Sequence, residues 1–265
     1  MEKTELEVGR FVIPYRLYKN DGPQIICVNG IQQSMAMWHM LIKRFSHDYQ
    51  MVLFDFPNQG KAKILSGPST ASLDEQVEIL LAVMDKTGIN AEARLCTASW
   101  GGVVAAALAS KYPDRVKHLI MASLGTKPNK KMIETIKKGV NLDPENRDEM
   151  AATLIASFGQ ALPAHLKLGI VKQFKNMDTK SIKAFCEYGL SIIESRQLNE
   201  VVDLSLIKAK TILLHGGNDA IIDLNDVKFL AAQIPDCKLK IIDGVGHFLH
   251  MEQENVLDVY AAALC

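Results

Sequence analysis

A serine, an aspartate and a histidine lie in this chain where together they suit covalent chemistry at a carbonyl group. Ser99 stands in the segment TASWG (97–101), Asp219 follows the run TILLH and a Gly-Gly pair, and His247 lies in the segment GVGHF. A serine hydroxyl is a poor nucleophile without a base, and His247 is predicted to be that base. Asp219 is predicted to hold the imidazole in the tautomer that accepts the serine proton. The three residues therefore predict acyl transfer through an acyl-enzyme on Ser99.

The segment around Ser99 has the strand-turn-helix character of a nucleophile elbow, whose pattern is G-x-S-x-G. The sequence RLCTASWGGVVAAA (94–107) runs from an apolar strand into a helix of small residues. So tight a turn needs small residues near the serine, which Gly101 and Gly102 provide, whereas Thr97 stands where glycine is usual. The turn is predicted to strain the backbone of Ser99 and to expose its hydroxyl. The alternative is that Ser99 is an ordinary helix N-cap.

Acyl transfer also needs donors for the developing oxyanion. The N–H of the residue after the nucleophile, Trp100, is one predicted donor, and the loop after an early strand should give the second. In that loop, Asn29-Gly30 precedes Ile31, whose N–H is the candidate. Asn29, Gly30 and Gly101 are predicted to shape the site. The alternative for Asn29-Gly30 is a plain strand-exit turn.

Four other acidic or imidazole side chains lie near the predicted site. Asp223 is an alternative acid, or a cap for the helix that follows it. Asp243 is interpreted as structural. His215, at a strand end, is interpreted as bonding a neighbouring loop, and His250 as lining the pocket.

Short apolar runs alternate with amphipathic ones, which indicates an α/β fold with a mostly parallel sheet covered by helices on both faces. The predicted strands are 11–18, 24–28, 51–54, 93–97, 116–122, 211–215 and 238–242. Helices are predicted over 73–86, 101–111 and 255–262, with Ser72 and Glu75 as a capping box for the first.

The alternation is interrupted after the fifth predicted strand. Between Gly125 and about Leu206 only helical stretches are predicted, at 130–139, 149–158, 164–175 and 180–195. Residues 1–125 and 207–265 are therefore predicted to form the core. Residues 126–206 are predicted to be a helical lid inserted into it, not an independent domain.

Composition excludes several classes of function. Lys+Arg and Asp+Glu both total 30, so no nucleic-acid partner is expected. No apolar run is long enough to span a membrane, residues 1–8 do not resemble a signal peptide, and the five cysteines form no C-x-x-C pair. A cytoplasmic location is expected. No metal site and no cofactor are expected, because neither ligand spacing nor a phosphate-binding glycine loop is present.

Five segments together resemble one branch of the α/β-hydrolases. They are CVNGIQQSM, MVLFDFPNQGKA, SLDEQVEILLAVMD, CTASWGG and GVGHFLHME. That branch holds the synthase of 3-(3-hydroxyalkanoyloxy)alkanoic acids, which are rhamnolipid precursors, and the 3-hydroxyacyl-ACP:CoA transacylase or thioesterase. The resemblance covers residues 24–125 and returns near Asp219 and His247. The chain departs from the branch at Thr97 and at residues 58–61, NQGK.

The resemblance implies acyl transfer from a 3-hydroxyacyl thioester of acyl carrier protein (ACP) or CoA to a hydroxyacyl, CoA or water acceptor. The lid would choose chain length and acceptor, and its lysines at 127, 130, 131, 137 and 138 would meet a carrier protein or CoA unless they form an ordinary solvated face. One alternative is a carboxylesterase of small esters with the same three residues. Another is a non-catalytic ligand receptor, against which the presence of all three residues argues. No integral membrane association is expected.

Overall fold

The computed structural model describes residues 2–89, 93–193 and 196–265. Within these ranges nine strands form one sheet in the order β1-β2-β4-β3-β6-β7-β8-β9, with β5 pairing with β2. Six of them are parallel: β4 (Gln50–Phe54), β3 (Gln24–Val28), β6 (Arg94–Ala98), β7 (His118–Ala122), β8 (Lys210–Gly216) and β9 (Cys237–Ile242). The antiparallel strands are β1 (Glu2–Val8), β2 (Phe11–Tyr18) and β5 (Lys63–Ile64).

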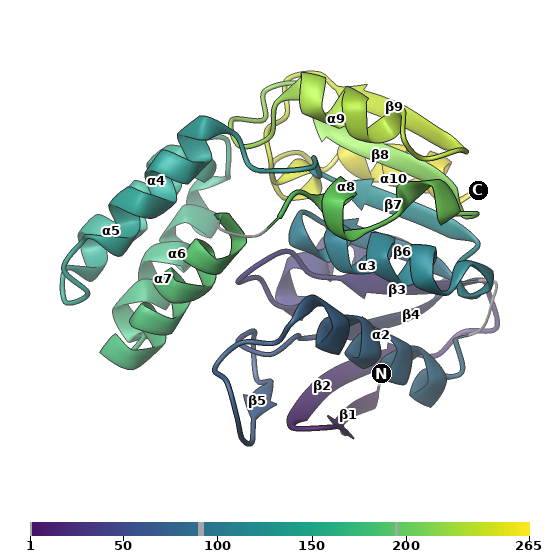
Figure 1. The fold of residues 1–265 in the computed structure, drawn as a ribbon, viewed down its shortest axis with the longest axis horizontal. Helices are drawn as coiled ribbons and strands as arrows, with labels where there is room; N and C mark the ends of the chain where they lie inside the picture. Colours follow the sequence, from purple (N-terminus) through teal and green to yellow (C-terminus); the bar gives the residue numbers. More distant parts are fainter. Residues whose placement is uncertain (1, 90–92, 194–195) are drawn as a thin grey trace.

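Helices cover both faces of this sheet because alternate residues of each strand point to opposite sides. In β3, Ile26 and Val28 belong to one buried apolar cluster, whereas Ile25 and Cys27 belong to the other. The first cluster lies under α2 (Leu73–Thr87), α3 (Trp100–Lys111) and α9 (Leu224–Ala231), and the second under α1 (His39–Phe45) and α10 (Val256–Leu264). Figure 1 shows α2, α3 and the short α8 (Leu198–Val201) in front of the sheet.

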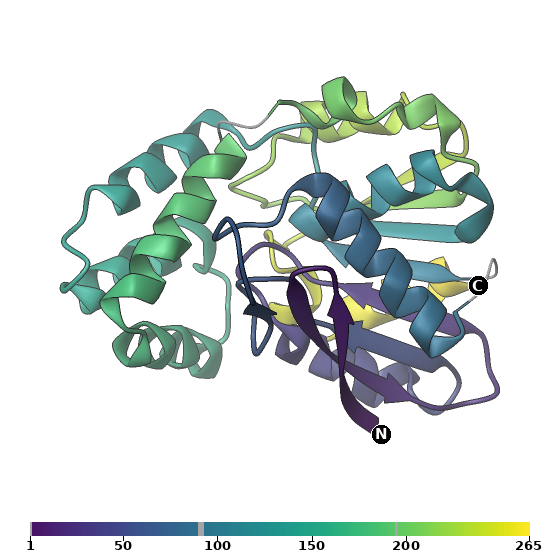
Figure 2. The same cartoon turned by 60° about the horizontal axis from the view of Figure 1, so that its bottom comes forward.

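Four further helices form a separate group at one side of the molecule, coloured teal and green in Figure 1. They are α4 (Lys130–Val140), α5 (Arg147–Phe158), α6 (Ala164–Asn176) and α7 (Thr179–Ile193). Figure 2 shows the same group from another direction, still beside the sheet and not over its helix-covered faces. Its own buried core is small, consisting of Met150, Ala151, Phe174 and Ile182.

The mostly parallel α/β fold predicted from the sequence is confirmed. The capping box of α2 is also confirmed, since Ser72 Oγ accepts from Glu75 N and the Glu75 side chain accepts from Ser72 N. Strands β1 and β5 and helices α1 and α8 were not among the predicted elements, whereas α9 lies where a helix was expected after Asp223. The predicted helix at 180–195 corresponds to α7, and its last two residues lie outside the described ranges.

Candidate active site

Ser99 lies at the point of the sheet where the strand order reverses. The chain goes from β3 to β4 on one side and then crosses back to β6 on the other, which is where open α/β sheets form their binding crevices. Val28 of β3 pairs with Thr97 of β6 in the register of these strands. Ile31 and Trp100 each follow their paired strand residue by three positions, so the two predicted oxyanion donors leave the sheet side by side.

The turn at Ser99 is strained and tightly packed. Ser99 has φ 47° and ψ −119°, outside the regions that side chains favour, and its N–H donates to Ala122 O at 2.8 Å. A Cβ on Gly101 would lie 2.4 Å from Val28 O, so only glycine lets α3 begin this close to β3. Ser99 is the N-cap residue of α3 by position but makes no side-chain cap bond, which argues against a capping role. Within the described residues the Ser99 hydroxyl has no hydrogen-bond partner.

The structure brings Asp219 and His247 into direct contact. His247 Nδ1 lies 2.8 Å from Asp219 Oδ2, and the Asp219 side chain is fully buried. The other carboxylate oxygen, Oδ1, accepts from Ile221 N at 2.8 Å and Ile222 N at 3.1 Å. Burial would raise the pKa of Asp219, but His247 and these hydrogen bonds outweigh it and lower the pKa. An ionised Asp219 accepts the Nδ1 proton, which leaves Nε2 of a neutral His247 free to accept another.

Three hydrogen bonds fix the main chain around His247. The Glu252 carboxylate accepts from Gly246 N at 2.6 Å and from Phe248 N at 3.0 Å, one on each side of the histidine. Ser123 Oγ, at the end of β7, donates to His247 O at 2.6 Å. The sequence reasoning missed both Glu252 and Ser123. Neither residue belongs to a sequence motif that would predict its role. Ser123 is a serine after a strand, and Glu252 resembles an exposed acid before a helix.

The loop that carries Ile31 is anchored by buried amides. Asn29 Nδ2 donates to Phe54 O at 2.9 Å, and Asn29 Oδ1 accepts from Trp38 Nε1 at 2.7 Å. Gln59 Nε2 donates to Gly30 O at 2.8 Å. Asn29 is completely buried, so it shapes the site by holding the loop in place and not by facing a substrate.

One donor of this loop is already occupied and its neighbour is not. Gly30 N donates to Gln33 Oε1 at 2.9 Å. In the part of the chain that the structure describes, neither Ile31 N nor Trp100 N has an acceptor. Both N–H groups are therefore available to a substrate oxygen.

Backbone strain is concentrated in the loops at the carboxyl ends of the parallel strands, here called the carboxyl edge of the sheet. Among the residues that the structure describes, five non-glycine residues have positive φ: Gln32 after β3, Asn58 after β4, Ser99 after β6, Ser123 after β7, and Leu249 beside the histidine loop. Residues held in such conformations gather at functional sites, where the surrounding structure enforces them.

The structure agrees with the sequence interpretation of the four neighbouring side chains only in part. His215 makes no bond to a neighbouring loop; its buried Nδ1 has no hydrogen-bond partner and lies 3.9 Å from Asp219 Oδ2. His250 is buried and stacks against Trp38, and burial lowers its pKa to about 4. Asp223 occupies the N-cap of α9 without a side-chain cap bond, and Asp243 is exposed.

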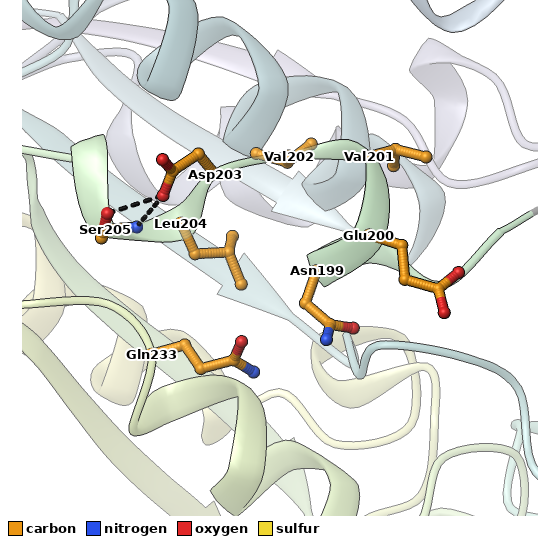
Figure 3. A pocket seen from close by; sticks show the side chains of 8 residues that line it. All are labelled: Asn199, Glu200, Val201, Val202, Asp203, Leu204, Ser205 and Gln233. Carbon is orange, nitrogen blue, oxygen red and sulfur yellow. Dashed lines mark hydrogen bonds between the residues drawn. The ribbon is translucent and has the colours of Figure 1, made fainter.

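A cavity of about 450 Å³ lies elsewhere, between residues 199–205 and Gln233 (Figure 3). It shares no residue with the Ser99 site, and the Asp203 carboxylate within it already accepts from Ser205 N and Oγ. Across residues 2–89, 93–193 and 196–265, no cluster of three His, Cys, Asp or Glu side chains could hold a metal ion. Over the same residues, no helix combines the length and apolarity needed to cross a bilayer.

Comparison with known proteins gives a consistent family. Residues 23–254 match the family described as alpha/beta hydrolase fold. Human monoacylglycerol lipase ABHD6 is 23% identical, over 92% of this chain and 75% of that protein. The (R)-3-hydroxydecanoyl-ACP:CoA transacylase of Pseudomonas putida is 20% identical, over 94% of this chain and 85% of that protein. The solved structure of MGS-M2, an alpha/beta hydrolase enzyme from a deep-sea metagenome library, superposes with a TM-score of 0.84 at 19% identity, over 98% of this chain and 96% of that one.

Proposed function

Because the chain belongs to the alpha/beta hydrolase fold family and is an enzyme of it, we propose that Ser99, His247 and Asp219 carry out acyl transfer at the edge of the sheet. The observation that carries the proposal is the 2.8 Å contact between His247 Nδ1 and the buried Asp219 carboxylate. Such a pair can act as the general base for a nucleophile that gives up a proton, and Ser99 is held in a strained turn at the carboxyl ends of the same strands.

The reaction proceeds in two halves. In the first, Ser99 Oγ attacks the acyl carbonyl carbon while His247 Nε2 takes the hydroxyl proton. The bond to the leaving sulfur or oxygen breaks, and the leaving group takes that proton from His247. In the second, an acceptor gives its proton to Nε2 and bonds to the carbonyl carbon. The ester bond to Ser99 then breaks as His247 returns that proton to Ser99 Oγ. Trp100 N and Ile31 N stabilise the oxyanion in both halves, where each such donor typically contributes about 100- to 1,000-fold in rate.

The proposed acyl donor is a 3-hydroxyacyl thioester of ACP or CoA. Support comes from the motifs shared with the transacylase branch and from the name of the Pseudomonas putida relative. The acceptor is a hydroxyacyl group, CoA or water. Hydrolysis of a carboxylic ester by the same residues is the second candidate, favoured by the similarity to a monoacylglycerol lipase. Both reactions pass through one acyl-enzyme and differ only in donor and acceptor.

Residues 126–206 act in this proposal as a lid on a core of 1–125 and 207–265. The first lid helix is joined to the acid loop, since Asn129 N donates to Ile221 O at 2.9 Å and Asn129 Nδ2 donates to Ala220 O at 3.0 Å. Met132 and Phe158 of the lid pack against the main core, whereas Leu168 is 69% exposed. The lid lysines at 127, 130, 131, 137 and 138 are exposed. We also propose a cytoplasmic location.

The test compares products. The purified protein is incubated with 3-hydroxydecanoyl-ACP, with and without CoA, beside Ser99→Ala, and the products are identified by mass spectrometry. An acyl-CoA or a dimeric ester that is absent with the variant supports transfer, and free 3-hydroxy acid alone identifies a thioesterase. No thioester turnover, combined with rapid cleavage of a p-nitrophenyl ester, would contradict the thioester proposal in favour of the esterase.

A further inference from the structure

Helix α7 of the lid is connected to both loops that carry the proposed oxyanion donors. On one side, Gln32, the residue after Ile31, donates through Nε2 to Phe185 O of α7 at 2.6 Å. Gln32 has φ 58°, a conformation that costs energy for a residue with a side chain. The hydrogen bond to α7 therefore helps to hold the backbone next to Ile31 in an unfavourable shape.

On the other side, the connection runs through a buried amide. Trp100 Nε1 donates to Gln76 Oε1 at 2.9 Å, and Gln76 Nε2 donates to Ala71 O at 3.0 Å. Gln76 is 1% exposed in α2, and its side chain also interacts with the Tyr188 hydroxyl of α7. Burial raises the pKa of Tyr188 to about 12, although Gln76 acts against that rise, so the hydroxyl keeps its proton at neutral pH.

The two connections leave α7 within one turn of each other. One uses the main-chain O of Phe185, and the other uses the side chain of Tyr188, three residues further along the helix. Phe185 also packs edge-on against Phe174 of the lid core, with ring centroids 5.3 Å apart. A shift of the lid core therefore moves both connections together.

We propose that Gln32, Gln76 and Tyr188, here called the α7 seat, are positioning residues through which the lid helix sets the orientation of the Ile31 and Trp100 N–H donors. The inference rests on the oxyanion roles in the proposed function. An acyl chain that binds in the lid and holds α7 in contact with Gln32 and Gln76 raises the rate of acylation of Ser99. A chain that leaves α7 out of these contacts is bound but is attacked slowly.

The test measures covalent labelling of Ser99 by a short-chain fluorophosphonate, because this reaction needs the oxyanion donors but no particular substrate. Gln32→Asn keeps an amide and tolerates positive φ but is too short to reach Phe185 O. Tyr188→Phe removes one hydroxyl. Each is expected to lower the maximal labelling rate about 5- to 20-fold and leave the inhibitor constant within about 2-fold, a smaller loss than complete removal of a donor.

The controls are Gln173→Asn on an exposed face of the lid and Tyr112→Phe beside α3, which should label like the parent. The double variant Gln32→Asn with Tyr188→Phe should fall less than the product of the two single effects, because both act through α7. Unchanged labelling in folded Gln32→Asn and Tyr188→Phe overturns the α7 seat. A parent protein that labels at Ser99 but does not turn over acyl thioester contradicts the proposed substrate only, and absence of any Ser99 labelling contradicts both proposals.

Discussion

The carboxyl edge of the sheet and the lid helices are built in different ways. At the edge, side chains are directed at main-chain atoms: Glu252 holds two amides beside His247, and Ser123 holds the carbonyl of that histidine. In the lid, α4 has no buried residue, and four buried side chains form the only cluster of their own among the described lid residues.

This difference indicates where the protein can tolerate change. Main-chain hydrogen bonds and strained turns specify one geometry, because an unpaired buried polar group costs about 1–3 kcal/mol. Apolar packing in a small cluster can rearrange when side chains of similar volume are exchanged. The edge is therefore suited to fixed chemistry and the lid to a variable acyl chain. Each of the following changes tests whether the two regions are separable.

The largest expected effect comes from the nucleophile at the edge. Ser99→Ala should lower kcat/KM about 10⁴- to 10⁶-fold, because the acyl-enzyme can no longer form. Turnover of a p-nitrophenyl ester is measured beside Ser110→Ala, at the far end of the same helix, where the hydroxyl donates to Asp203 O. Near-parental activity in Ser99→Ala would show that Ser99 is not the nucleophile of the reaction.

The next effect tests main-chain anchoring of the histidine. Glu252→Gln can accept only one of the two amide hydrogens and turns its own N–H₂ toward the other. Losing a charge-assisted bond of about 1.5–3 kcal/mol corresponds to a decrease of about 10- to 100-fold in kcat. Glu254→Gln is the matched control, since Glu254 is exposed. Equal kcat in the two variants would show that the loop holds His247 without its carboxylate.

The same difference explains what the sequence could and could not predict. Ser99 and Gly101 were recognisable because a tight turn imposes residue types on adjacent positions. Asp219 was preferred to Asp223 because it lies just past the predicted strand 211–215, whereas Asp223 could cap the helix that follows it. Glu252 and Gln76 could not be recognised in this way, because their partners are set by tertiary folding. Gln76 looks like one polar residue of an amphipathic helix until Trp100 is placed against it.

The fold shows the same division. Strands β2 and β3 were predicted to the residue, since they are apolar runs ended by turn residues. Strand β1 was missed although the alternation of charged and apolar residues in ELEV (5–8) is typical of a half-buried strand, and β1 pairs with β2 at the lateral edge of the sheet. The lid helices were predicted from periodicity, yet the apolar side chain of Leu168 on α6 is exposed. Periodicity predicts a helix and leaves the face that meets the pocket undetermined.

A smaller effect is expected in the lid itself. Phe174 is buried and packs against Phe185, so Phe174→Ala should cost about 3–5 kcal/mol of local stability. Hydrogen exchange should accelerate in α5, α6 and α7 while the strands keep their protection. We expect kcat/KM to fall about 10-fold for a long-chain ester and less for a short one. The exposed residue Leu168, changed to alanine, is the control. Loss of protection in the strands would show that the two regions unfold as one unit.

The smallest effect concerns the ion pair between Arg10, in the turn between β1 and β2, and Glu75 of α2. Arg10 Nε lies 2.8 Å from Glu75 Oε1, and the hydrogen bond from Arg10 lowers the pKa of Glu75 to about 2, from an ordinary value of 4.5. Because the folded pKa is below the unfolded one, the ion pair stabilises the fold fully above about pH 4.5, and that stability is lost as pH falls toward 2.

Glu75→Gln should therefore lower Tm by less than about 3 °C at pH 7, since the partly exposed carboxylate is screened by solvent. The glutamine still completes the capping box with Ser72, so the difference isolates the charge. Thermal unfolding from pH 7 to pH 2.5, beside Glu78→Gln on the same helix, should show the deficit shrinking as the pH falls. A decrease in Tm that stays constant with pH would show that Glu75→Gln acts through packing and not through the charge. A change in the rate of Ser99 labelling would show that the Arg10–Glu75 pair also supports the neighbouring Gln76, which accepts from Trp100.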